Sequence, residues 1–328
     1  MLFTQADGDR PAADRWAQDL AKRLFPNYPM ADLPEDHSIY RVLYQPSDRP
    51  PMRYVTNGSR ILMLHSSTDI AQHWQTRDER GHRGLFELGM NIILYASGKG
   101  EFRNRLAAAT PYDVQQTDPA AGGQIAVARV KYAGNWDPEP AAWTRFARFF
   151  RRETDVGLGV TPTALADLSA GAAGFAHWTG TAAYTPTDAE VDAIRKYVTE
   201  GGVLLIEPTG GGSDFYTAAQ AAVRKAFPDA QPQLVSKMHP ILTPSGPAMD
   251  DLTKPRTRLY TRGQGRGGGG RIDAVTAGRG KVILSPLDLT TGLLGSNVWG
   301  VLGFEKDYAM RLTKNVILWS ATGMPEEQ

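Results

Sequence analysis

Four stretches of the sequence carry side chains that could do chemistry, and each stretch follows an apolar run. The candidates are Asn135, Trp136 and Asp137, then His177 and Thr179, then Glu207, Thr209, Gly210 and Asp214, and finally Ser285 and Asp288. If the apolar runs are parallel strands, these side chains meet in the crevice at the carboxyl ends of the strands. Trp stacks on apolar ligand faces and carboxylates accept hydrogen bonds, so the set predicts a site for a polar small molecule or a glycan.

Each candidate also has a structural interpretation. Asp137 stands before Pro138, as the N-cap of a helix would. The glycines that begin at Gly210 suit a tight turn better than a phosphate cradle, since no Lys-Ser/Thr follows them. Asp288 fits an Asx turn. Glu207, Asp288 and Asp137 offer oxygen ligands to a hard cation, but their spacing requires none. We therefore expect no metal and no cofactor.

Nucleophilic catalysis has little support in the sequence. The chain has no cysteine, which excludes a thiolate nucleophile and a cysteine-dependent amidotransferase. Thr209 or Ser213 could act as an oxygen nucleophile with His177 as the base, but no G-x-S-x-G turn surrounds them. The remaining catalytic candidates are carboxylates, Glu207 and Asp288, which could serve as acid and base in a hydrolase.

Strands alternate with helices over residues 125–321. The patterns predict strands at 125–133, 174–180, 203–207 and 281–285, and helices that open at 137–138, 187, 214 and 305. The segments 258–262 and 271–277 suggest a hairpin. The run 203–207 has no polar alternation, which is typical of a strand buried on both faces. The sequence therefore predicts a three-layer α/β/α fold with a mostly parallel sheet.

The sequence also repeats itself. Residues 2–40 align on 204–242 with eight identities, among them His37 with His239, and later Asp69 aligns with Asp288. This pattern predicts a partial, C-terminal half-domain at 1–107, a linker at 108–124, a complete domain at 125–321 and a tail at 322–328. We expect the missing half to be supplied by a protein partner or by a strand and helix encoded before Met1, as in a membrane-anchored assembly, because an unpaired strand edge promotes aggregation.

Charge and hydropathy exclude several partners. Basic and acidic residues number 36 and 35, for a net charge of +1, so no nucleic-acid partner is expected. The glycine-arginine tract at 262–271 fits a flexible loop. No apolar run reaches the ~20 residues that span a bilayer, and the N-terminus lacks a signal-peptide pattern. Localisation is therefore open.

Four motifs together support a family resemblance: VARVKYAGNWDPEP, HWTGT, EPTGGGSDF and ILSPLDL. They resemble the bacterial domain-of-unknown-function family 4159, grouped with class I glutamine-amidotransferase-like, flavodoxin-like folds. The resemblance implies that fold and an envelope or secreted location, without an established activity. Amidotransferases carry a Cys at the turn where this chain has Glu207-Pro208-Thr209-Gly210.

Two functions remain open at this point. The first is a non-catalytic ligand-binding or scaffolding module with a degenerate amidotransferase-like fold. The alternative is a hydrolase of a glycan or another polar polymer. Carboxyl groups about 5–10 Å apart in a cleft, one with a raised pKa, favour the hydrolase.

Overall fold

The computed structural model describes residues 1–7, 10–99, 120–265 and 270–324, and these divide into two compact units. Unit 1 is formed by the residues up to 99 together with Asn297–Val301, and unit 2 by the rest. Most of the predicted linker, residues 108–119, lies outside the described residues, as do residues 325–328 of the predicted tail.

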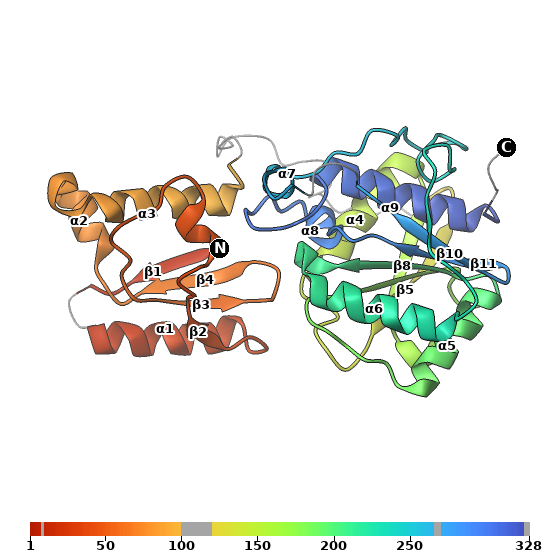
Figure 1. The fold of residues 1–328 in the computed structure, drawn as a ribbon, viewed down its shortest axis with the longest axis horizontal. Coiled ribbons are helices and arrows are strands. Elements are labelled where there is room, and N and C mark those ends of the chain that lie inside the picture. The colour runs from red at the N-terminus through yellow and green to blue at the C-terminus, as the bar shows by residue number, and fades with distance from the viewer. Residues whose placement is uncertain (8–9, 100–119, 266–269, 325–328) are drawn as a thin grey trace. The chain divides into compact units, whose positions relative to one another are not determined.

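Unit 2 contains a seven-stranded, mostly parallel sheet in a mixed α/β fold (Figure 1). Its strand order is β6-β5-β7-β8-β11-β10-β9; the β11–β10 and β10–β9 pairs are antiparallel and the other pairs are parallel. The strands are β5 (Gln124–Lys131), β6 (Gly157–Ala164), β7 (Phe175–Gly180), β8 (Val203–Pro208), β9 (Gln233–Leu234), β10 (Asp273–Ala277) and β11 (Gly280–Leu284). Every residue of β8 is buried, which confirms the prediction for 203–207.

Helices cover both faces of this sheet. They are α4 (Ala141–Thr154), α5 (Asp188–Thr199), α6 (Ser213–Ala226), α7 (Leu259–Gly263), α8 (Thr290–Leu293) and α9 (Lys306–Ala321), with 3-10 turns at Leu165–Asp167 and Thr209–Gly211. Figure 1 shows α5 and α6 on one side of the sheet and α4 and α9 on the other. Alternate residues of β8 divide between two cores: Val203 and Leu205 pack with α4 and α9, whereas Leu204 and Ile206 pack with α5 and α6.

Local signals explain where several of these helices begin, and one expectation was wrong. The predicted capping box is present at α5, where Thr187 and Glu190 satisfy each other's backbone N–H groups. Asp137 caps no helix. Instead, α4 starts at Ala141, and the Asp137 carboxylate accepts a 2.6 Å bond from Arg129. A buried arginine attracts a carboxylate more strongly than a solvated helix end does.

The hairpin predicted for 258–262 and 271–277 was also wrong. Residues 259–263 form α7, and β10 instead pairs with β11, the next strand along the chain. The first segment turns helical because Arg258 is anchored in the interior by a 3.0 Å bond from Nε to the Phe304 carbonyl. Strand β6 lies at the edge of the sheet, where its Gly and Pro residues are tolerated.

Unit 1 has a smaller sheet with the order β1-β4-β3-β2. The strands are β1 (Leu2–Gln5), β2 (Met30–Asp32), β3 (Met52–Thr56) and β4 (Ile61–Ser66), and only the β1–β4 pair is parallel. The helices are α1 (Arg10–Leu24), α2 (Ile70–Thr76) and α3 (Glu79–Ser97), with a 3-10 turn at Ser38–Arg41. One core lies between the sheet and α1, and a second between the sheet and α3. This order repeats the order β8-β11-β10-β9 of unit 2, direction for direction.

Side-chain contacts also recur at aligned positions. The His37 Nδ1 atom accepts the Ile39 N–H at 3.1 Å, and the His239 Nδ1 atom accepts the Ile241 N–H at 3.2 Å. Each of these imidazoles packs against an aromatic ring of the last helix of its unit. On the same helices, Asn91 and Asn315 both bind backbone groups of the loop that follows the histidine. The repeated histidines are therefore loop anchors.

Candidate functional site

Glu207, at the end of β8, is fully buried and held by hydroxyl and backbone donors. Its Oε1 atom lies 2.7 Å from the Thr179 hydroxyl and accepts the Thr290 hydroxyl at 2.5 Å. Its Oε2 atom accepts the Leu289 N–H at 3.1 Å, at the start of α8. The side chain therefore connects three sequence segments that meet at the carboxyl end of the sheet.

His177 faces this carboxylate from the middle of β7. Its Nε2 atom lies 3.3 Å from Glu207 Oε1, and its Nδ1 atom accepts the indole N–H of Trp143 at 3.2 Å. Because Nδ1 accepts a hydrogen bond, a ring with one proton carries it on Nε2, which lies near the carboxylate without forming a hydrogen bond to it. A histidine held this way has no free basic nitrogen to activate Thr209 or Ser213.

Asp288 lies at the start of α8 and is also fully buried. Its Oδ2 atom accepts the Gly210 N–H at 2.7 Å, and its carboxylate also accepts the N–H and the hydroxyl of Thr291. The guanidinium of Arg258 lies 4.0 Å away and donates to the Thr291 hydroxyl at 2.8 Å. Asp288 therefore joins the turn after β8 to the turn after β11.

The two carboxyl groups have opposite pKa shifts. Burial and the neighbouring charge of Glu207 raise the pKa of Asp288 to about 7. Burial also acts to raise the pKa of Glu207, but the nearby His177 and the hydroxyls of Thr290 and Thr179 outweigh it and lower that pKa. Opposed pKa values in one cluster occur in acid–base catalysis and in structural networks alike, so accessibility has to distinguish them.

The side chains of this cluster are closed to solvent and to substrate. Glu207 and Asp288 have 0% exposure and His177 has 2%. Thr209 and Ser285 are buried as well: the Thr209 hydroxyl lies 2.6 Å from that of Thr179, and the Ser285 hydroxyl donates to the Leu287 carbonyl. The predicted residues thus come together in the interior. Thr179 bonds to Glu207 and Thr209, Asp288 accepts the Gly210 N–H, His177 lies beside Glu207, and Ser285 caps its own turn.

The glycine turn after β8 supports the same conclusion. Gly210 and Gly211 have φ angles of 84° and 79°, which favour glycine, and a Cβ on Gly211 would lie 2.1 Å from the Leu302 carbonyl oxygen. The Gly210 N–H is already bound by Asp288. This turn is therefore a close-packed connection, as the turn interpretation predicted, and its Gly210 amide is not available to a phosphate.

The other predicted residues form a more accessible rim. The Asn135 amide donates to the Thr181 hydroxyl at 2.8 Å, and Arg129 stacks on Trp136 while it binds Asp137. These side chains are half-buried, and Asp214 is exposed at the start of α6. The structure thus separates the predicted site into a buried network and this rim.

The aligned positions of unit 1 have a different environment. The Gln5 amide donates to Asp69 Oδ1 at 2.7 Å, and its carbonyl accepts the Ala71 N–H, much as Glu207 holds the start of α8. A cavity of about 550 Å³ opens beside them at the carboxyl ends of β1 and β4. Its lining is mostly polar: Gln5, Ala6, Asp7, Arg10, Asp69, Ala71, Gln72 and Gln75. This place matches the expected ligand crevice of a parallel sheet.

A second cavity, of about 700 Å³, lies in unit 2 near β9 and β10. It is lined by Asp229, Ala230, Gln231, Gln233, Leu234, Val235, Ser236, His239, Ala274, Thr276 and Lys281. None of the predicted site residues lines either cavity.

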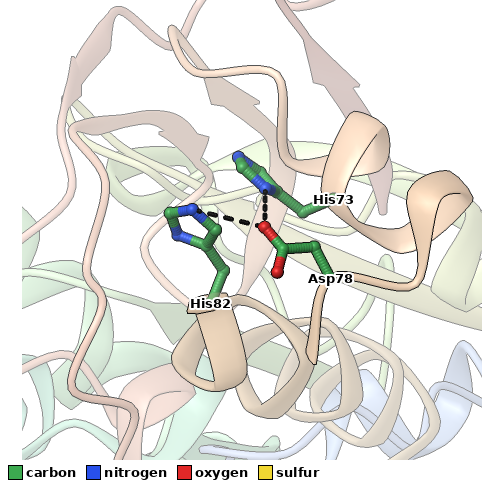
Figure 2. A group of neighbouring side chains, drawn as sticks. All are labelled: His73, Asp78 and His82. Carbon is green, nitrogen blue, oxygen red and sulfur yellow. Dashed lines mark ion pairs between the residues drawn. The ribbon is translucent and has the colours of Figure 1, made fainter. Parts of the chain in front are cut away.

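One group of metal-ligand residues was not predicted from the sequence. His73, Asp78 and His82 gather where α2 meets α3, with one potential ligand atom from each within 4.8 Å of the others (Figure 2). The signal is the spacing H-x4-D-x3-H, which matches no common metal motif because a turn interrupts the helix between the first two ligands.

Comparison with known proteins gives a family and no activity. A family model described as "Domain of unknown function (DUF4159)" matches residues 1–97 and 126–320. A search of curated proteins finds no match. Among the described residues, no helix has the length and apolar character needed to cross a membrane.

Proposed function

We propose that this chain, which belongs to the domain-of-unknown-function family DUF4159, is a non-catalytic binding module with a degenerate amidotransferase-like, flavodoxin-like fold. The observation that carries the proposal is the burial of Glu207, Asp288 and His177, together with the use of both carboxylates to join strands to helices. The chain also has no cysteine. The position at which an amidotransferase holds its nucleophile is here a structural junction.

The architecture of unit 2 supports the proposed fold class. A parallel core of five strands has helices on both faces, which is the arrangement expected of three α/β/α layers. We propose further that unit 1 is a duplicate of the second half of unit 2. The shared strand order and the matched contacts of His37 with His239, and of Asn91 with Asn315, support that origin.

The polar cavity of unit 1 is the proposed ligand site. Within the described part of the chain, Arg10 and Gln75 line it without the structural bonds that Gln5 and Asp69 make, so they are the residues to vary. Amide, guanidinium and carboxylate groups together suit a ligand with several hydroxyl or carboxyl groups, such as a sugar or a sugar acid.

A thermal-shift screen of monosaccharides, disaccharides and sugar acids tests this site. A ligand of the cavity should raise the Tm of the wild type and of Asp214→Ala, and leave that of the double variant Arg10→Ala/Gln75→Ala unchanged. Loss of the shift in Asp214→Ala alone would instead place the ligand at the rim of unit 2, and an equal shift in all three proteins would exclude both sites.

The edge of the unit 1 sheet supports a scaffolding role. Among the residues that the structure describes, strand β1 pairs with β4 alone, whereas the aligned strand β8 has β7 on its other side. Leu2 is 38% exposed, while every residue of β8 is buried. An unpaired edge accepts an added strand from a partner. Hydrogen exchange tests whether the edge is open: the amides of β1 should exchange faster than those of β8 in the isolated chain, and equal protection would contradict an open edge.

The alternative function, a hydrolase of glycans or other polar polymers, rests on the raised pKa of Asp288 beside Glu207. It requires the network to open to substrate. Hydrolysis of a polysaccharide panel that is lost in Glu207→Gln, while that variant stays folded, would support the alternative over the binding module.

A further inference from the structure

His73, Asp78 and His82 of unit 1 lie in a hairpin of two helices that the proposed ligand site does not involve. His73 is in the last turn of α2, Asp78 is the N-cap of α3, and His82 lies in the first turns of α3. Figure 2 shows both imidazoles directed at one oxygen of the Asp78 carboxylate. The His73 Nδ1 and His82 Nε2 atoms are each 3.6 Å from Asp78 Oδ2.

These distances are longer than hydrogen bonds and close to those between two ligands of one metal ion. A hydrogen bond between nitrogen and oxygen spans 2.7–3.2 Å, so 3.6 Å is too long for either histidine to donate well to Oδ2. Two ligand atoms that share one tetrahedral Zn²⁺, at about 2.0–2.1 Å from each, lie about 3.4 Å apart. Octahedral neighbours at about 2.1 Å would lie only about 3.0 Å apart. Both nitrogen–oxygen distances are closer to the tetrahedral value. The two imidazole rings, whose centroids lie 3.9 Å apart, would have to turn apart to direct one nitrogen of each at a shared ion.

The backbone holds the three ligands in place. The Asp78 N–H donates to the His73 carbonyl at 3.0 Å across a turn in which Arg77 is left-handed, with φ of 55°. The His82 N–H donates to the Asp78 carbonyl at 3.1 Å. The residue at 82 then departs from helical geometry, with φ of −136° and ψ of 43°. Each ligand is thus tied to the next through main-chain bonds.

The carboxylate of Asp78 has a second partner that fixes its orientation. Its Oδ1 atom accepts the Gly81 N–H at 3.2 Å and caps α3, which leaves Oδ2 toward the imidazoles. The neighbouring Trp74 fastens the two helices together, since its indole N–H donates to the Leu85 carbonyl at 3.2 Å. A metal ligand that is oriented by an outer hydrogen bond binds more tightly than a free one.

We propose that His73, Asp78 and His82 form a binding site for a divalent transition metal of the Zn²⁺ type, with water as the fourth ligand. Two imidazole nitrogens and one carboxylate oxygen are a common donor set for zinc sites that keep an open position. The side chains are 23%, 46% and 43% exposed, so the ion would enter from solvent and the fourth position would remain accessible.

The experiment uses the full, untagged chain after dialysis against a chelator. Zn²⁺ affinity is measured by competition with a chromophoric chelator, and Co²⁺ is added separately to read the coordination geometry from its visible absorption. We expect one Zn²⁺ per chain and the intense visible bands of tetrahedral Co²⁺. The single variants His73→Ala and His82→Ala should each weaken Zn²⁺ binding at least about tenfold, because even loss of an outer-shell partner costs 10–100-fold.

Two further variants separate ligation from charge and folding. Asp78→Asn keeps an acceptor for the Gly81 N–H and should weaken binding and change the Co²⁺ spectrum. Glu79→Gln removes a charge from the same turn without removing a ligand and should bind Zn²⁺ as the wild type does. Zn²⁺ should raise the Tm of the wild type and not that of His73→Ala/His82→Ala. Equal affinity in the wild type and the double variant, or a weakly absorbing octahedral Co²⁺ spectrum, would overturn the proposal.

Discussion

Replacing Glu207 with Gln should destabilise unit 2, and by an amount that depends on pH. The carboxylate accepts bonds from Thr179, Thr290 and the Leu289 N–H. Glutamine presents one oxygen and one NH₂ group, so one of the two sides loses its acceptor. A buried bond to a charged group contributes about 1.5–3 kcal/mol, and an orphaned buried N–H costs about 1–3 kcal/mol. We therefore expect a loss of about 2–4 kcal/mol at pH 5.

The pH dependence follows from Asp288. Its pKa in the folded state is about 7, against 3.8 for an ordinary aspartate, so the folded chain retains a proton that the unfolded chain releases. The stabilisation is complete below about pH 4 and is lost as the pH rises through 7, by at most about 1.4 kcal/mol per pH unit. Because the charge of Glu207 is one cause of that raised pKa, Glu207→Gln should flatten this dependence, and its own cost should be smaller at pH 8 than at pH 5.

The assay is urea unfolding from pH 5 to pH 8, with hydrogen exchange of peptides from β8 and β11, corrected for intrinsic rates, to report on unit 2. The control is Glu200→Gln, which removes an exposed carboxylate next to α5 in the same unit and should change stability by less than about 0.5 kcal/mol. A Glu207→Gln protein with wild-type stability and a wild-type pH slope would refute the assignment of Glu207 and Asp288 to one coupled network.

Three other perturbations test separate parts of the structure. Gly180→Ala should cost at least about 2 kcal/mol in urea unfolding, since its Cβ would lie 2.0 Å from the Tyr132 hydroxyl; wild-type stability would contradict this packing. Asn315→Ala should cost about 2–4 kcal/mol, because it removes bonds to Ile241 and Asp250, and a loss below about 1 kcal/mol would count against the loop-anchor role. The stability of unit 1 should rise with pH between about 4 and 6.5, since burial lowers the pKa of His37 to about 4. Hydrogen-exchange protection in α3, corrected for intrinsic rates, should rise with it, and protection that does not change with pH would contradict this prediction.

The sequence was most informative where one local signal determines the structure. The uninterrupted apolar run at 203–207 predicted a strand buried on both faces, and Thr187 with Glu190 predicted the start of α5. The prediction of local structure failed where a contact outside the local segment determines the conformation. Asp137 has the local context of an N-cap, but it binds Arg129 of β5, eight residues earlier in the chain. Segment 258–262 has a strand-like composition, but the buried contacts of Arg258 turn it into α7.

The burial of the predicted site residues could not be foreseen for a similar reason. A carboxylate at the end of a central strand can face a crevice or the interior, and the sequence alone does not distinguish the two. At Glu207 the interior arrangement depends on Thr179 and Thr290, which lie 28 and 83 residues away. The group of His73, Asp78 and His82 was missed because its ligands meet across a left-handed turn, and no helical or strand period connects them.

The difference between Gln5 and Glu207 offers a physical reason why one unit has an open crevice and the other does not. Two buried carboxylates repel each other and need a closed shell of donors, which Thr179, Thr290 and Arg258 provide in unit 2. In unit 1 the neutral amide of Gln5 donates directly to Asp69, so the pair satisfies itself and needs no such shell. The carboxyl ends of β1 and β4 can then remain exposed to solvent, beside the 550 Å³ cavity. An amide in place of the carboxylate thus removes the need for a closed shell of donors at this junction, which is consistent with the polar cavity beside Gln5.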